Sequence, residues 1–338
     1  MRTLAAAALA FCWLAAGTNA SAQSEADYLN LIDAYSHGAV QEPVKALAAW
    51  PAARVSANVG TTAGRPGVNW KAAAMLHTEV AFATSGDGRS STHLNAARTL
   101  VNRIPGDDGR AFRARWHAWI VVLHIAQGNF SRASQEINLG FSDDSRSGEL
   151  GLARGMLSEL TARGIEPNLQ GTWSAPVGNG ARERADALLK DAAAEYERAL
   201  ASAPDLLEAR LRLGWVLFVN HSRPHAREEL RQVADHATRP ELLYLAHLFL
   251  GAVDEADQRV DDALREYNEA YAVVPGQSSA LALMRLELLV GQDQRAKPLA
   301  AALATGAGIA VRDPWQNYND GITSVALFEW LRHEAQSR

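Results

Sequence analysis

The sequence predicts an all-α fold in which antiparallel helical hairpins stack on one another. A series of a small, an aromatic, a small and a proline residue occurs twice in the second half of the chain. The two copies are Ala192, Tyr196, Ala199, Pro204 and Ala263, Tyr267, Ala270, Pro275, with a partial copy, Ala226, Leu230, Val233, between them. Ala226 lies 34 residues after Ala192, a period typical of stacked hairpins. Apolar residues elsewhere follow helical spacing, and no alternating strand pattern runs for more than a few residues.

Each repeat is expected to contain two helices that approach closely. Gly214 and Gly251 fall within the first helices, where glycine costs about 1 kcal/mol relative to alanine. Such a glycine is expected where a neighbouring helix comes near. Tyr196 follows Ala192 by four residues, so both lie on the same face of the second helix, and Tyr196 is expected to fill the space between hairpins. Pro204 ends that helix because proline lacks the backbone donor that a continuing helix needs.

Helical spacing and turn residues predict further helices before the repeats. They are expected at 25–35, 41–50, 70–84, 92–103, 110–127, 131–138 and 149–163. The stretch 53–69, which contains three glycines and a proline, is predicted to be a loop. The helix at 70–84 is apolar on most sides and is therefore expected to be buried.

The chain is expected to have five parts. The predicted parts are a secretory signal at 1–22, an N-terminal helical-hairpin region at 23–163, a Gly/Pro-rich loop at 164–181, repeats at 182–305, and a C-terminal loop with a capping helix at 306–338. A connection as long as the one at 164–181 is unusual inside a stack of helices and is either a linker or a binding loop.

The repeat pattern resembles the tetratricopeptide-repeat family, most clearly over residues 183–275. The resemblance implies an α-α superhelix, that is, a solenoid of stacked hairpins with a concave face that binds other proteins. In that family the first helix of each hairpin lines the concave face, which places Leu211, Trp215 and Phe218 near it. The resemblance implies no particular ligand.

Residues 1–22 are expected to direct export. Arg2 provides a positive end, an apolar run follows at 4–16, and small residues at 20–22 form a cleavage site before Gln23. The alternative is an anchor that stays uncleaved. Cys12 in the apolar run is the only cysteine, so the mature chain is expected to have neither disulfides nor thiol catalysis. The composition and the signal indicate a bacterial protein that is periplasmic or secreted.

The charge of the mature chain argues against nucleic acid as a partner. Removal of Arg2 with the signal leaves 32 of the 33 basic residues against 38 acidic ones, a net charge of −6 with histidine neutral. Nucleic-acid binding requires a basic face. No stretch of the mature chain is apolar for long enough to predict a transmembrane segment.

The sequence offers no catalytic, cofactor-binding or metal-binding set. His77 and Glu79 are two positions apart, so on a helix they point to different sides and cannot chelate one ion together. We expect them to form buried hydrogen bonds, and a proton-transfer role stays an alternative. Gly-x-Ser-x-Gly, phosphate-loop and His-Glu-x-x-His motifs are absent.

We therefore expect an exported scaffold, without catalysis, that binds other envelope proteins or peptides. The candidate binding residues are Leu211, Trp215, Phe218, Trp173 and Trp315, each of which has a core position as its alternative. Two other functions stay open. The first is a helical-shell enzyme with a site near His77, Glu79 and His93. The second is a permanent structural subunit of an envelope complex, which an exposed apolar patch would favour.

Overall fold

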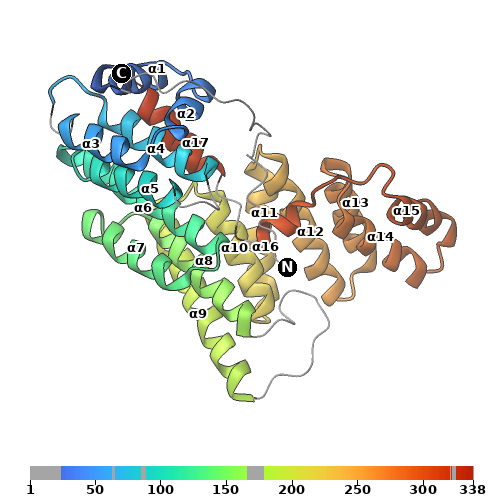
Figure 1. Ribbon diagram of the computed structural model, residues 1–338. Helices are drawn as coiled ribbons and strands as arrows, with labels where there is room; N and C mark the ends of the chain where they lie inside the picture. Colours follow the sequence, from blue (N-terminus) through green and yellow to red (C-terminus); the bar gives the residue numbers. More distant parts are fainter. Residues whose placement is uncertain are drawn as a thin grey trace. The chain divides into compact units, whose positions relative to one another are not determined.

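The computed structural model describes residues 24–62, 65–84, 89–165, 179–319, 321 and 325–337. Every regular element in these residues is a helix (Figure 1), which confirms the all-α prediction. The helices form two compact units, each described by itself below. Unit 1 contains the described residues up to Trp119 together with 142–144 and those from 325 onward, and unit 2 contains the described residues of 120–141 and 145–324.

Unit 1 is organised around one buried helix. Its helices are α1 (Glu25–Ser36), α2 (Gln41–Ala48), α3 (Ala52–Thr62), α4 (Trp70–Ala83), α5 (Arg89–Val101), the first part of α6 (Gly106–Ala126), and α17 (Val325–Gln336). Helix α4 packs against α1, α2, α5 and α17. All of its residues from Ala72 to Ala81 are buried, as expected for a helix that is apolar on most sides.

Helix α3 replaces the first part of the loop that was predicted for 53–69, and residues 65–69 are a loop as predicted. Val55, Asn58, Val59 and Thr62 are its buried residues, and their spacing is that of one helical face. Gly60 lies within this helix. Together with the glycines and the proline at 64–67, it caused the start of the loop to be predicted too far toward the N-terminus. The helical spacing of the buried side chains outweighs the cost of one glycine near the helix end.

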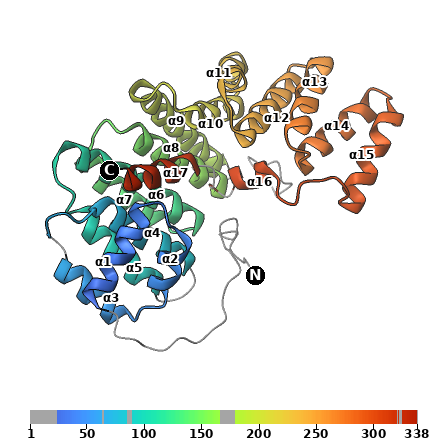
Figure 2. The same cartoon turned by 90° about the horizontal axis from the view of Figure 1, so that it is seen from above.

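Unit 2 is a series of antiparallel hairpins, which confirms the stacked-hairpin prediction (Figures 1 and 2). It contains the end of α6 and most of α7 (Phe130–Asp143). The helices that follow are α8 (Gly148–Ile165), α9 (Asn179–Ser202), α10 (Leu207–Val219), α11 (Arg223–His236), α12 (Pro240–Ala256), α13 (Val260–Val273), α14 (Gln277–Leu289), α15 (Asp293–Thr305) and α16 (Pro314–Asn319). The closest pairs are α8 with α9, α10 with α11, α12 with α13 and α14 with α15.

The recurring spacing between each glycine and its partner reflects close contact inside each hairpin. A Cβ atom added to Gly214 would lie 2.7 Å from Leu230 Cγ, and one added to Gly251 would lie 2.5 Å from Tyr267 Cδ1. Each glycine precedes its partner by 16 residues. Gly155 on α8 meets Tyr196 on α9 in the same way, although the two are 41 residues apart. Hairpin α8–α9 therefore matches the repeats, with a long connection between its helices.

Two predicted boundaries differ from the structure. The stretch 164–181 was expected to separate two regions, whereas α8 and α9 on either side of it pair as one hairpin of unit 2. The last helix was expected to cap the repeats, whereas α17 packs on α4 in unit 1. Its apolar residue Phe328 meets Phe82 and Trp119 at ring-centroid distances of 5.9 and 4.9 Å. This aromatic cluster covers the apolar face of α17.

Candidate protein-interaction surface

Three partly exposed aromatic rings come together on unit 2. Trp215 and Phe218 lie on α10, and Trp315 lies on α16, about a hundred residues further along the chain. The ring centroid of Trp215 is 5.5 Å from that of Phe218 and 5.1 Å from that of Trp315. We refer to Trp215, Phe218 and Trp315 as the aromatic ledge. The structure thus brings together three of the five residues that the sequence singled out.

The ledge rests on a buried aromatic layer. Phe249 of α12 is almost completely buried, and its ring centroid is 4.4 Å from that of Trp215 and 5.3 Å from that of Trp315. Tyr318 stacks on Trp315 with an interplanar angle of 15°. Rings packed at these distances interact favourably beyond the area that they bury. The ledge side chains are therefore fixed on one side, and the partly exposed side faces away from the core.

Helix α16 is held in place by polar contacts at both of its ends. At its start, Asp313 is buried and accepts hydrogen bonds from the backbone N–H of Trp315 at 2.9 Å and of Ser278 at 2.6 Å, and from the Tyr244 hydroxyl at 3.1 Å. Pro314 follows at the first helical position, where its missing N–H has no cost. At its end, the Tyr318 hydroxyl donates to Glu159 Oε1 at 2.8 Å.

Glu159 is the centre of a buried ionic network. Its carboxylate also accepts a hydrogen bond from the Tyr196 hydroxyl at 2.6 Å and contacts the guanidinium groups of Arg163 and Arg212, the latter at 3.1 Å. Burial alone would raise the pKa of Glu159, but the two guanidinium groups and the two tyrosine hydroxyls together lower it below its ordinary value. The carboxylate is therefore charged and links α8, α9, α10 and α16.

The two arginines also shape the surroundings of Tyr318. Their guanidinium carbons lie 4.7 Å (Arg163) and 4.4 Å (Arg212) from the centroid of the Tyr318 ring. Arg163 additionally donates to Asn319 Oδ1 at 2.7 Å. Burial and the Glu159 carboxylate raise the pKa of the Tyr318 hydroxyl well above its ordinary value, so it stays protonated and donates to Glu159. These contacts orient α16 and with it the Trp315 ring.

The remaining candidate binding residues do not join the ledge. Leu211 is fully buried in the core of unit 2, so it corresponds to the core alternative. Trp173 lies outside the described residues. Phe249 and Tyr318 were not predicted as part of the site, because aromatic character alone does not distinguish them from ordinary core residues.

His77 and His93 meet in unit 1, but both are buried. His77 Nδ1 is 2.9 Å from His93 Nδ1, and His77 Nε2 is 2.8 Å from the Tyr28 hydroxyl. Glu79 accepts hydrogen bonds from the Tyr35 hydroxyl at 2.5 Å and from Arg332 Nε at 2.8 Å. His77 is 0% exposed and His93 1% exposed, so neither imidazole can be reached from solvent in this conformation. The arrangement is that of buried hydrogen-bonded pairs, as the sequence analysis expected.

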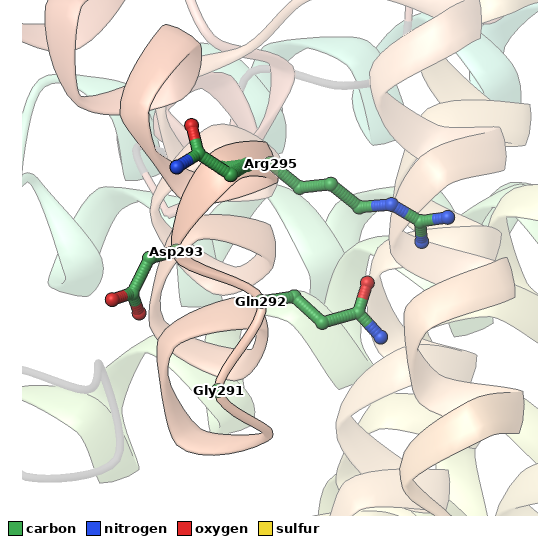
Figure 3. Close-up of a pocket in the computed structure, with 5 residues that line it drawn as sticks. Gly291, Gln292, Asp293 and Arg295 are labelled. Carbon is green, nitrogen blue, oxygen red and sulfur yellow. The ribbon is translucent and has the colours of Figure 1, made fainter.

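The turn before α15 forms a shallow surface pocket of about 430 Å³ (Figure 3). It is lined only by consecutive residues, from Gly291 to Arg295. Figure 3 shows that Gln292 and Arg295 extend to one side of the turn and Asp293 to the other. These side chains therefore do not converge on one point.

Comparison with solved structures identifies helical-repeat proteins. PilF of Pseudomonas aeruginosa is 17% identical, with 67% of this chain and 93% of that chain covered and a TM-score of 0.48. MamA AMB-1 is 20% identical, with 59% and 94% covered and a TM-score of 0.39. An IFIT1 monomeric mutant with Gppp-AAAA is 14% identical, with 83% and 68% covered and a TM-score of 0.49. No family profile and no curated protein matches the sequence.

The class of the protein follows from its own hairpins. The glycine contacts inside successive hairpins define unit 2 as a stack of antiparallel helical hairpins. The recurrent series of small, aromatic and proline residues in this stack resembles the tetratricopeptide-repeat pattern. Within the described part of the chain, no helix is both long and apolar enough to cross a bilayer.

Proposed function

We propose that this protein is an exported scaffold that binds other proteins of the cell envelope through the aromatic ledge and has no catalytic activity of its own. The observation that carries the proposal is the convergence of three partly exposed aromatic rings from α10 and α16. Tryptophan and other large aromatic residues are enriched among the residues that dominate protein-binding energy. Repeat arrays of this type offer extended surfaces for such contacts.

The packing of the ledge supports this proposal. Trp215 is held by Phe249 and Trp315, so little side-chain freedom remains to be lost when a partner binds. A fixed ring can therefore contribute most of its buried area to affinity. The partner segment expected to fit has one or more apolar side chains that pack against the rings.

The test is affinity purification of the tagged full-length protein from its own envelope fraction, followed by mass spectrometry. Phe218→Ala removes a partly exposed ring of the ledge, and Phe130→Ala is the matched control because Phe130 on α7 is 38% exposed and lies outside the ledge. We expect the co-purifying proteins to be lost with Phe218→Ala and kept with Phe130→Ala. An identical set with both variants would contradict binding through the ledge.

Export is tested separately. N-terminal sequencing of the protein from the envelope fraction should begin near Gln23, where the signal at 1–22 ends. Recovery of the chain from the cell interior with its N-terminal methionine intact would contradict export. The ledge could still bind proteins in that case, so the two parts of the proposal can fail independently.

A permanent structural subunit is the second candidate, and an exposed apolar patch favours it. Leu281, Leu288, Leu289 and Val290 on and after α14 are 43%, 51%, 71% and 40% exposed. Large apolar side chains gathered on one element are typical of a surface that another protein covers. If this candidate is correct, the protein should leave the envelope only together with a stoichiometric partner, and Leu288→Glu should release it.

A further inference from the structure

A second pocket of unit 2 lies between three helices and contains a buried carboxylate. Its volume is about 340 Å³. It is lined by Asn268 and Tyr271 of α13, Leu283 and Glu287 of α14, and Arg295, Pro298 and Leu299 of α15. Leucine and proline side chains thus form part of the wall, and three oxygen-bearing side chains lie among them. This combination is typical of a binding pocket with a few polar groups that fix a ligand.

Glu287 is the unusual member of this set. It is only 4% exposed, and its Oε2 atom is buried without a hydrogen-bond partner among the described residues. Its Oε1 atom is 3.7 Å from Arg295 Nη1, which is too long for a hydrogen bond. The Arg295 side chain is 70% exposed, so this contact is weak and easily given up. A buried carboxylate oxygen without a donor is costly, and a donor from a ligand would remove this cost.

We propose that this pocket binds a primary ammonium group on an apolar stem, namely a lysine side chain of a partner protein. An ammonium group has three donors and no acceptor. Glu287, Asn268 and Tyr271 are the lining residues whose side chains carry acceptor oxygens. Asn268 donates through Nδ2 to the Leu264 carbonyl oxygen at 2.7 Å, so its other polar atom is the acceptor. The methylene stem packs against Leu283 and Leu299.

A divalent cation fits less well. A divalent metal ion needs several carboxylate or imidazole ligands, and in the described residues no three His, Cys, Asp or Glu side chains come together. A single lysine ammonium needs only one carboxylate and a few neutral acceptors.

This inference rests on the proposed scaffold function for the identity of the partner. Its test does not depend on that function. A partner that lays apolar side chains on the ledge would carry a lysine for this pocket. The test uses a small probe instead of the partner. Failure to find an envelope partner would therefore leave its result unchanged.

The probe is Nα-acetyl-lysine N-methylamide, titrated into the full chain and followed by NMR of leucine methyl groups. We expect saturable shifts at Leu283 and Leu299 with a dissociation constant on the order of 10 mM, the range of so small a ligand. The norleucine analogue has a similar stem without the ammonium group and should give no saturable shift. Equal binding of both probes would overturn the assignment.

Variants identify the carboxylate. Glu287→Gln keeps the shape of the side chain and should abolish the shifts. Glu241→Gln is the matched control, because Glu241 on α12 is about half exposed and does not line the pocket. Arg295→Gln removes the cation beside Oε1 and should tighten probe binding severalfold. Unchanged binding in Glu287→Gln would overturn the proposal. Loss of binding in Arg295→Gln would also overturn the proposal, because a neighbouring cation cannot help to bind an ammonium group.

Discussion

Gly251 offers a direct test of how the hairpins are held together. On α12 it lies against Tyr267 of α13, and an added Cβ would be 2.5 Å from both Cδ1 and Cε1 of that ring. Real Cβ atoms do not approach a ring carbon so closely, so Gly251→Ala must displace the tyrosine or the helix. The Tyr267 hydroxyl donates to Glu255 Oε2 at 3.0 Å, so the displaced ring also puts this hydrogen bond at risk.

The expected magnitude is a balance of two effects. Alanine in place of glycine within a helix stabilises it by about 1 kcal/mol. Overpacking of a close contact costs about 1–3 kcal/mol. We therefore expect Gly251→Ala to lower the free energy of unfolding by about 0–2 kcal/mol, and Gly251→Leu, with a larger side chain, to lower it by about 1–3 kcal/mol.

The control is a helical glycine that faces open space. An added Cβ at Gly164 near the end of α8 has no atom within 4 Å, so Gly164→Ala should stabilise unit 2 by about 0.4–1 kcal/mol. Urea unfolding followed by tryptophan fluorescence measures all three variants. The reasoning is refuted if Gly251→Leu is as stable as the parent, or if Gly251→Ala stabilises the protein as much as Gly164→Ala does.

Three further predictions concern the ionic network, the buried histidines and the ledge. Glu159→Gln should destabilise the protein by about 3–5 kcal/mol in urea unfolding, because two buried guanidinium groups lose their counter-ion; parent-like stability would contradict this role. Burial, and then His93, holds the pKa of His77 well below its ordinary 6.5. The unfolded chain therefore binds a proton that the folded one does not, and the free energy of unfolding should fall as pH decreases below about 6.5, by up to about 1.4 kcal/mol per pH unit. His77→Gln should flatten this part of the pH profile. Trp215→Ala should weaken partner binding by about 2 kcal/mol and also lower the melting temperature, and a change in melting temperature alone would assign the ring to the core.

The repeats could be predicted from the sequence because their physical signal is local. Gly251 and Tyr267 are 16 residues apart in one hairpin, and the same spacing joins Gly214 to Leu230. A period that recurs is visible without any knowledge of distant contacts. The hairpin α8–α9 was missed because Gly155 and Tyr196, which make the equivalent contact, are 41 residues apart. The long connection hid the spacing that identifies the other hairpins.

The ledge could be predicted only in part, because it depends on contacts between distant segments. Trp215 and Trp315 were each recognisable as candidates, Trp215 from its place on the first helix of a repeat. Nothing in the sequence states that their rings lie 5.1 Å apart. The contact depends on the position of α16. Asp313 and Tyr318 fix this position through hydrogen bonds to Tyr244 and Glu159, which lie 69 and 159 positions away in the sequence. Such long-range pairs leave no periodic signal.

The origin of the ledge also indicates which segments would determine the specificity of the proposed binding. Trp215 follows Gly214 by one residue, and the residue that follows Gly251 in the next hairpin is Ala252. Of these two hairpins, only the one formed by α10 and α11 therefore has a tryptophan at this position. The second tryptophan of the ledge, Trp315, comes from α16 outside the repeats. A partner that contacts both rings would therefore recognise the junction between α10 and α16 as well as the repeats. If the proposed binding is correct, the Glu159 network should affect it at a distance, since a change that releases Tyr318 should also displace Trp315 from the ledge.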